Sequence, residues 1–226
     1  MGPDDIVFQV ATWLIPLVIA IVLHEISHGW VAKAFGDPTA SDLGRLSPNP
    51  IRHVDPIGTV VLPMVLAVTG APVFGWAKPV PVIAAKMRNP RVHMMLVAAA
   101  GPATNLLLAL IGAIAMALII PDLNPGARET PFVVATLENF LLVNVFLAVF
   151  NMLPMPPFDG GHVVEGLLPR RLAARYASIG KYGFLLLILL IVVLPMIAPQ
   201  ANIVERIVVP PVQLILGFLL GLVGLA

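Results

Sequence analysis

The chain has 226 residues, of which 59% are hydrophobic and only 11% are charged; it has no cysteine and a formal net charge of +1. A soluble domain carries about 25% charged residues, so this composition could not cover a water-facing surface. The charge offers no basic surplus for nucleic acid, and the lack of cysteine excludes disulfides and thiolate metal sites. The composition predicts a protein embedded in a lipid bilayer, in which His, Asp or Glu must hold any metal ion.

Six apolar stretches are long enough to consider as membrane spans, since a helix needs about 20 apolar residues to cross the hydrocarbon core. The first is long and contains a polar patch, and prolines separate the last two. The second is short and is interrupted by Pro56, Pro63 and Pro72. The stretches are 6–35, 56–74, 92–120, 132–153, 182–198 and 203–225.

The segments between these stretches are short and rich in proline. Residues 36–55 are expected to be irregular, and residues 75–90, with Trp76 and alternating valines, are expected to form one or two short strands. We therefore predict an all-α polytopic membrane protein: a bundle of about five to six transmembrane helices with a re-entrant segment and a small β-element. The chain is expected to form one domain over 1–226, with its core at about 6–168 and C-terminal spans at about 178–226.

The run His24-Glu25-Ile26-Ser27-His28 lies inside the first apolar stretch and matches the pattern H-E-x-x-H. At about 100° per residue, helical positions four apart lie about 40° from one another, so both imidazoles reach one point beside the helix. Glu25 lies on the same side and can reach a water molecule there. Ionisable residues inside a span are costly and functional by default. The pattern predicts a metal site at His24 and His28, with Glu25 as general base.

A catalytic zinc ion has three protein ligands and one open position. A third histidine six residues after the second is excluded, because position 34 is alanine. Asp159 stands out among the acids, since it follows the span 132–153 in a run of prolines and glycines. Irregular backbone at membrane depth occurs only where it lines a cavity or is buried in protein. Asp55 is the rival third ligand, although an acid directly before a proline is more typical of a turn.

Two other classes of function fit parts of this pattern. A metal or proton transporter also uses intramembrane His and acidic residues, but the chain lacks the paired repeats typical of transporters, and transport needs no general base beside the histidines. A catalytically inactive scaffold has no need of His24, Glu25, His28 and Asp159 together. Intramembrane hydrolysis of a peptide bond is the leading hypothesis, and the transporter is the alternative.

The basic residues give a separate test of the topology. His28 and Asp159 must lie on one side of the membrane to share a metal ion, which requires 56–74 to be re-entrant. With the N-terminus outside, eleven of the thirteen lysines and arginines then lie inside, as the positive-inside rule requires, and only Arg128 and Arg206 lie outside. We therefore predict an active site near the cytoplasmic face. The eleven are Lys33, Arg45, Arg52, Lys78, Lys86, Arg88, Arg91, Arg170, Arg171, Arg175 and Lys181.

Three motifs, in this order and spacing, resemble the site-2 protease family of intramembrane zinc metalloproteases. They are the His24–His28 pattern, the run Gly101-Pro102-Ala103-Thr104-Asn105, and N-x-x-P-x-P-x-x-D-G from Asn151 to Gly160. Phe158 stands where the family usually has leucine. The resemblance covers about residues 20–185 and is to the short bacterial branch without a PDZ or CBS domain, so regulation by such a domain in cis is not expected.

The resemblance implies that His24, His28 and Asp159 bind one Zn²⁺ ion and that Glu25 is the general base. Asn151 and Asn105 would help to hold the substrate strand or the developing oxyanion.

The segment 75–82 would match a family β-element that pairs with an unwound substrate, since strand addition exposes the peptide bonds that a helix hides. The expected substrate is a single-span membrane protein such as an anti-sigma factor, or a remnant signal peptide, in the bacterial inner (plasma) membrane. Whether the chain forms a homodimer stays open.

Simpler roles stay open for several of these residues. The run 101–105 contains small residues that let helices pack closely. Asn151 could cap a helix end. His53, His93 and His162 are expected in loops or interfaces, with His162 close enough to Asp159 to support it.

Overall fold

The computed structural model describes residues 5–69, 75–119, 131–198, 200, 202 and 204–225. Within these residues, five helical segments are long and apolar enough to cross a membrane, and no β-strand is present. The all-α polytopic fold predicted from the sequence is therefore confirmed. The five segments are Ile6–Ala34, Pro90–Ile119, Phe132–Asn151, Arg170–Ile197 and Val204–Leu222.

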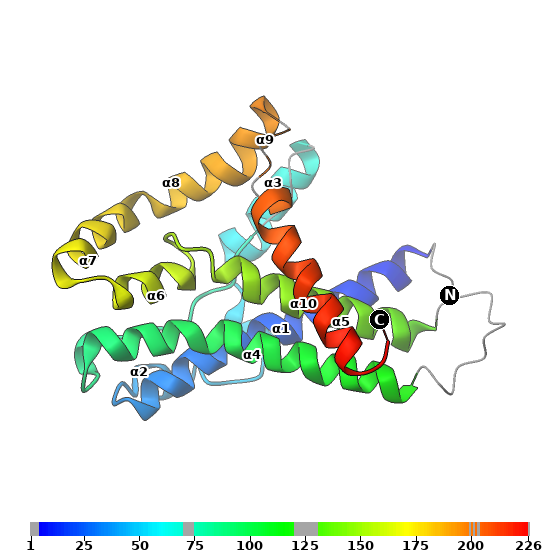
Figure 1. The fold of residues 1–226 in the computed structure, drawn as a ribbon, viewed down its shortest axis with the longest axis horizontal. Coiled ribbons are helices and arrows are strands. Elements are labelled where there is room, and N and C mark those ends of the chain that lie inside the picture. The colour runs from blue at the N-terminus through cyan, green and yellow to red at the C-terminus, as the bar shows by residue number, and fades with distance from the viewer. Residues whose placement is uncertain are drawn as a thin grey trace.

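Three long helices form the centre of the bundle: α1 (Ile6–Ala34), α4 (Pro90–Ile119) and α5 (Phe132–Asn151). They lie side by side, with α10 (Val209–Leu222) crossing α5 (Figure 1). Small residues allow this close approach, because van der Waals contact between backbones drives helix association in lipid. Fully buried alanines on α1 and α4 mark these contacts: Ala20, Ala32, Ala109 and Ala113.

Shorter helices surround this core. Between α1 and α4 lie α2 (Thr39–Asp42), a 3₁₀ turn (Pro50–His53), a π-helical turn (Pro56–Val61), α3 (Leu62–Thr69) and a second 3₁₀ turn (Ala84–Lys86). After α5 come α6 (Asp159–Leu167) and the chain of turns and helices α7 (Arg170–Ala177), α8 (Gly183–Ile188) and α9 (Leu194–Ile197). A π-helical turn (Val204–Val208) precedes α10.

Within residues 56–69, the described part of the second apolar stretch, the chain forms a short apolar helix, Pro56–Leu66, followed by the rest of α3. A helix of this length does not reach across the hydrocarbon core. Asp55 caps it: one carboxylate oxygen accepts hydrogen bonds from the N–H groups of Ile57 (3.0 Å) and Gly58 (2.7 Å). The re-entrant path stays a prediction, because residues 70–74 lie outside the described residues.

Residues 75–83 form neither a helix nor a strand, so the predicted β-element is not confirmed. Pro79 and Pro81 remove alternate N–H donors, which a ladder would need. Two of the remaining donors bond to the helical turns before α3: Trp76 N–H to the Gly58 carbonyl (3.1 Å) and Lys78 N–H to the His53 carbonyl (2.8 Å).

The turn between α5 and α6 returns the chain to the centre of the bundle, where α6 packs on α4. Gly160 makes the turn possible, since a Cβ at this position would overlap the carbonyl oxygens of Met152 and Leu153. The first residue of α6, Asp159, is thereby directed toward α1.

Candidate metal centre

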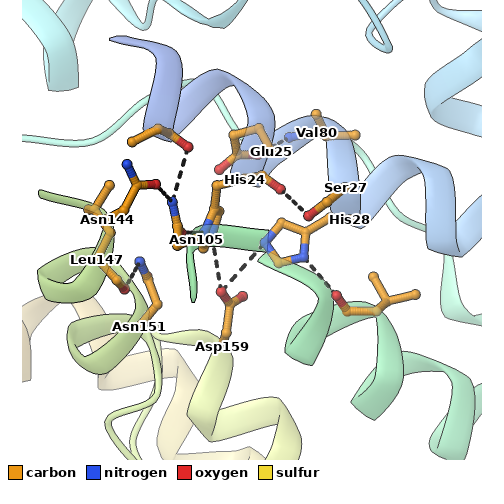
Figure 2. Close-up of polar contacts among 12 residues, drawn as sticks. His24, Glu25, Ser27, His28, Val80, Asn105, Asn144, Leu147, Asn151 and Asp159 are labelled. Carbon is orange, nitrogen blue, oxygen red and sulfur yellow. Dashed lines mark hydrogen bonds and ion pairs between the residues drawn. The ribbon is translucent and has the colours of Figure 1, made fainter. Parts of the chain in front are cut away.

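His24 and His28 lie one turn apart on α1 and face the same point. Their rings are perpendicular, with an interplanar angle of 87° and centroids 4.7 Å apart. Asp159 approaches from α6, with its Oδ2 atom 3.2 Å from His24 Nε2 and 3.5 Å from His28 Nε2 (Figure 2). One ligand atom from each residue lies within 4.8 Å of the others. Among the described residues, this is the one group of three or more His, Asp or Glu that could hold a metal ion.

Gly101 lets α4 lie directly against both imidazoles. A Cβ atom at this position would lie 2.5 Å from Cε1 and Nε2 of His24 and 2.6 Å from Cε1 of His28. Both rings are also buried, with His24 6% and His28 9% exposed. The run 101–105 is therefore a packing motif at Gly101, in contact with the predicted ligands themselves.

The outer ring nitrogens are hydrogen-bonded to α4. His28 Nδ1 lies 2.7 Å from the Val97 carbonyl oxygen, and His24 Nδ1 lies 2.6 Å from Asn105 Oδ1. A carbonyl only accepts, so the neutral His28 ring carries its proton on Nδ1 and presents a lone pair at Nε2. Such a bond fixes the orientation of a metal-binding histidine.

A cation fits the point between these three residues. Asp159 Oδ2 is buried and has no hydrogen-bond donor. It faces the Nε2 lone pair of His28, and two electron-rich atoms placed this way repel unless a positive charge lies between them. Two imidazoles and one carboxylate are a donor set found in catalytic zinc sites, which keep the fourth position open.

Glu25 is placed beside this group without belonging to it. Its Oε2 atom accepts a hydrogen bond from the Val80 N–H (2.8 Å), which ties the carboxylate to the irregular segment 75–83.

Asp37 holds the far end of the segment 75–83. This residue is fully buried, and nothing in the sequence pattern predicts its role. Its carboxylate accepts from the Ile83 N–H and from the hydroxyl and N–H of Thr39. Burial alone would raise the Asp37 pKa, but these bonds and nearby Lys86 hold that pKa below its ordinary value.

The two asparagines predicted to hold substrate have partners within the bundle. The Asn105 amide is fully buried and donates to Asn144 Oδ1 (2.9 Å) and to the Ala20 carbonyl (3.3 Å). Asn151 donates to the Leu147 carbonyl (3.0 Å) one turn back in its own helix. Their substrate roles stay predictions. The motifs in the sequence predict no role for Asn144, although an amide inside an apolar span is itself a signal of a buried polar contact.

The remaining histidines lie outside the metal group. His53 is buried and bonded to the Ser47 carbonyl, His93 stacks on Phe35 with ring centroids 4.1 Å apart, and His162 lies 3.6 Å from Glu165. Asp55, the rival third ligand, caps the turn as described above.

A multi-pass helical protein that directs two imidazoles and a carboxylate to one buried point has the architecture of a membrane-embedded metalloenzyme. Comparison with known proteins gives the same class. The model of Peptidase family M50 matches residues 12–123 and 118–193. The chain belongs to this family, the site-2 proteases, and is an intramembrane zinc metalloprotease that acts on membrane proteins.

Several curated relatives carry the name of zinc metalloprotease. YwhC of Bacillus subtilis is 38% identical over 183 residues, which cover 79% of this chain and 79% of that protein. Rip2 of Mycolicibacterium smegmatis is 28% identical over 186 residues, covering 82% of this chain and 67% of that protein. Rip3 of Mycobacterium tuberculosis is 41% identical over 76 residues, 33% of this chain and 18% of that protein. No solved structure matches the chain at a significant level. Membership of this protease family excludes the alternative hypothesis that the protein is a metal or proton transporter.

Proposed function

We propose that this protease hydrolyses a peptide bond in or near the transmembrane segment of a single-span membrane protein, with one zinc ion held by His24, His28 and Asp159. Glu25 is the proposed general base. The observation that carries the proposal is the convergence of three ligand atoms within 4.8 Å, from two helices far apart in sequence. All the proposed residues come from one chain, so the reaction does not require a homodimer.

The proposed reaction divides its tasks between the metal and the protein. A bound zinc ion supplies Lewis acidity, which polarises the scissile carbonyl and acidifies water. Glu25 takes the proton from the attacking water and passes it to the amine that leaves. The Val80 N–H, 2.8 Å from Glu25 Oε2, restrains this carboxylate before substrate binds. The buried helices around His24 and His28 limit the access of other water to the site.

The substrate is proposed to lie along residues 75–82 in extended form. This segment passes directly beside Glu25, and its donors at Trp76, Lys78 and Val80 turn into the protein. The opposite edge offers a substrate strand its backbone carbonyls and the N–H groups of Gly75 and Ala77, because Pro79 and Pro81 carry no N–H. Asn151, at the end of α5, and Asn105 are proposed to assist at the oxyanion or the substrate strand. The proposed substrate is a single-span membrane protein such as an anti-sigma factor, or a remnant signal peptide.

Replacing Glu25 by glutamine tests the proposed base. The variant keeps the shape of the side chain and all three ligands, so it is expected to bind zinc as the wild type does. Cleavage of a reporter transmembrane segment is expected to fall by about 10²–10⁴-fold, the contribution typical of general acid–base catalysis. Reporter cleavage and metal content are measured on the same detergent-purified preparations. Wild-type cleavage by a zinc-loaded Glu25→Gln protein would refute the assignment.

The active site is proposed to face the cytoplasm from the inner membrane, with the N-terminus outside. Basic residues gather at the C-terminal end of α1, where Lys33 contacts Ser41, Lys86 contacts Thr39 and Arg88 donates to the Ala34 carbonyl. Cytoplasmic ends of spans carry such an excess. The whole chain, 1–226, is proposed to act as one domain, with the core at about 6–168 and the spans from about 178 to 226 beside it.

A single engineered cysteine tests this orientation, because the chain has no cysteine of its own. Lys86→Cys is expected to resist a membrane-impermeant maleimide in intact cells and to react after the cells are opened. Ile6→Cys, at the opposite end of α1 and 76% exposed, is the matched control and should react from outside. Labelling of position 86 in intact cells would reverse the proposed topology.

A further inference from the structure

A chain of hydrogen bonds leads away from the metal centre into the bundle. His24 Nδ1 lies 2.6 Å from Asn105 Oδ1, Asn105 Nδ2 donates to Asn144 Oδ1 at 2.9 Å, and Asn144 Nδ2 donates to the Phe140 carbonyl at 2.8 Å (Figure 2 shows the part from His24 to Asn144). Asn105 and Asn144 are both fully buried. This series of hydrogen bonds therefore joins α1, α4 and α5 at a place where water does not compete for the bonds.

The direction of these bonds is fixed from the Phe140 end. A backbone carbonyl only accepts, so the amide nitrogen of Asn144 must face Phe140, and its oxygen must face Asn105. Asn105 must then donate to Asn144, and its nitrogen also faces the Ala20 carbonyl (3.3 Å), a second acceptor. The Asn105 oxygen is left to face His24. A neutral His24 can satisfy this oxygen only by donating from Nδ1.

We propose that Asn144 is a positioning residue for the metal centre: acting through Asn105, it holds His24 in the form protonated on Nδ1, so that Nε2 is free to bind the metal ion. The inference rests on the proposed function insofar as His24 is a zinc ligand. His28 needs no such chain, because the Val97 carbonyl holds its Nδ1 proton directly.

The alternative form of His24 would compete with metal binding. With the proton on Nε2, the ring would donate to Asp159 Oδ2, 3.2 Å away, and close the site with a hydrogen bond. If the Asn105 amide turned over, its nitrogen would donate to Nδ1 and stabilise this closed form. Asn144 and the Ala20 carbonyl both oppose the turn, because each places an oxygen at the Asn105 amide nitrogen, and the contact with Asn144 is the shorter, 2.9 Å against 3.3 Å.

The test replaces Asn144 by leucine, which has a similar volume and no polar atom. Zinc affinity, measured by competition with a chelator, is expected to fall by about 10–100-fold, as for other groups that orient metal ligands. Asn139→Leu is the matched control. Asn139 lies on the same helix and also links α5 to α1, because its amide donates to the Thr12 carbonyl (3.1 Å). It takes no part in the series of hydrogen bonds that leads to His24. Its replacement should leave zinc affinity unchanged.

A second readout follows the proton itself. In metal-free protein labelled with ¹⁵N-histidine, NMR should find His24 and His28 both protonated on Nδ1. In Asn144→Leu, the His24 signals should move toward the Nε2-protonated form while those of His28 stay in place. A loss of packing alone would not select one histidine.

Three results would overturn the proposal: a His24 proton on Nε2 in the wild type, an unchanged His24 in Asn144→Leu, or equal losses of zinc affinity in Asn144→Leu and Asn139→Leu. A wild-type spectrum with the His24 proton on Nε2 refutes the proposal even if the leucine variant does not fold. Neither readout involves cleavage, so failure here is distinguishable from failure of the proposed hydrolysis.

Discussion

Alanine at position 101 is expected to abolish stoichiometric zinc binding and, with it, proteolysis. The added Cβ would lie 2.5 Å from His24 Nε2 and 2.6 Å from His28 Cε1, distances that unbonded atoms do not adopt. Either α4 must move away or both rings must turn, and each change separates the ligand atoms. The helix itself is not weakened, since alanine is more favourable than glycine in a helix interior by about 1 kcal/mol.

Metal analysis of the purified variant in detergent measures this effect, with thermal unfolding as a check of folding. Gly112→Ala on the same helix is the matched control. Its Cβ would lie 3.0 Å from Phe140 Cδ1, a ring atom that contacts no metal ligand. The contact of Phe140 with Asn144 is made by its backbone carbonyl and not by the ring. The control should keep its zinc. A Gly101→Ala protein with wild-type zinc content would mean that the two imidazoles do not bind the ion in the arrangement seen here.

Asparagine at position 159 is expected to lower zinc affinity by more than about 100-fold, beyond the effect of losing a group that only orients a ligand. The amide keeps the shape of the side chain but loses the negative charge that faces the two Nε2 atoms at 3.2 and 3.5 Å. With two histidines left, the site has fewer than the three protein ligands of a catalytic zinc ion. Cleavage should fall with the metal.

Asp55→Asn separates the two candidate third ligands. Asp55 caps the turn at Ile57 and Gly58, so its replacement should change stability slightly and leave zinc affinity intact. Zinc affinities of the two variants are compared by the same chelator competition. The opposite pattern, with zinc lost in Asp55→Asn and kept in Asp159→Asn, would transfer the ligand role to Asp55.

The sequence predicts the parts of this site that depend on local geometry. The spacing of His24 and His28 determines that both face one side of a helix, whatever the rest of the chain does. Prolines and glycines around Asp159 indicate a turn buried at membrane depth. The main spans follow from the length of the apolar stretches, and α1, α4 and α5 agree with the predicted ranges to within about two residues.

Contacts between helices are not predictable in the same way. An amide such as Asn144 inside an apolar span signals a buried hydrogen bond, but the identity of its partner, Asn105, depends on how α4 and α5 pack. The position of Gly101 against two imidazoles depends equally on the packing of α4 on α1. The alternating valines in 75–90 predict one or two short strands, whereas Pro79 and Pro81 leave too few donors for a ladder.

X-ray absorption at the zinc edge of the purified wild-type protein tests the central claim most directly, because it reports the amount of zinc and the atoms around it together. We expect one zinc ion per chain, with scattering from two imidazole rings, a carboxylate oxygen and one further light atom. Zinc present in less than equimolar amount after metal loading, or a spectrum with fewer than two imidazoles, would contradict the shared site of His24, His28 and Asp159.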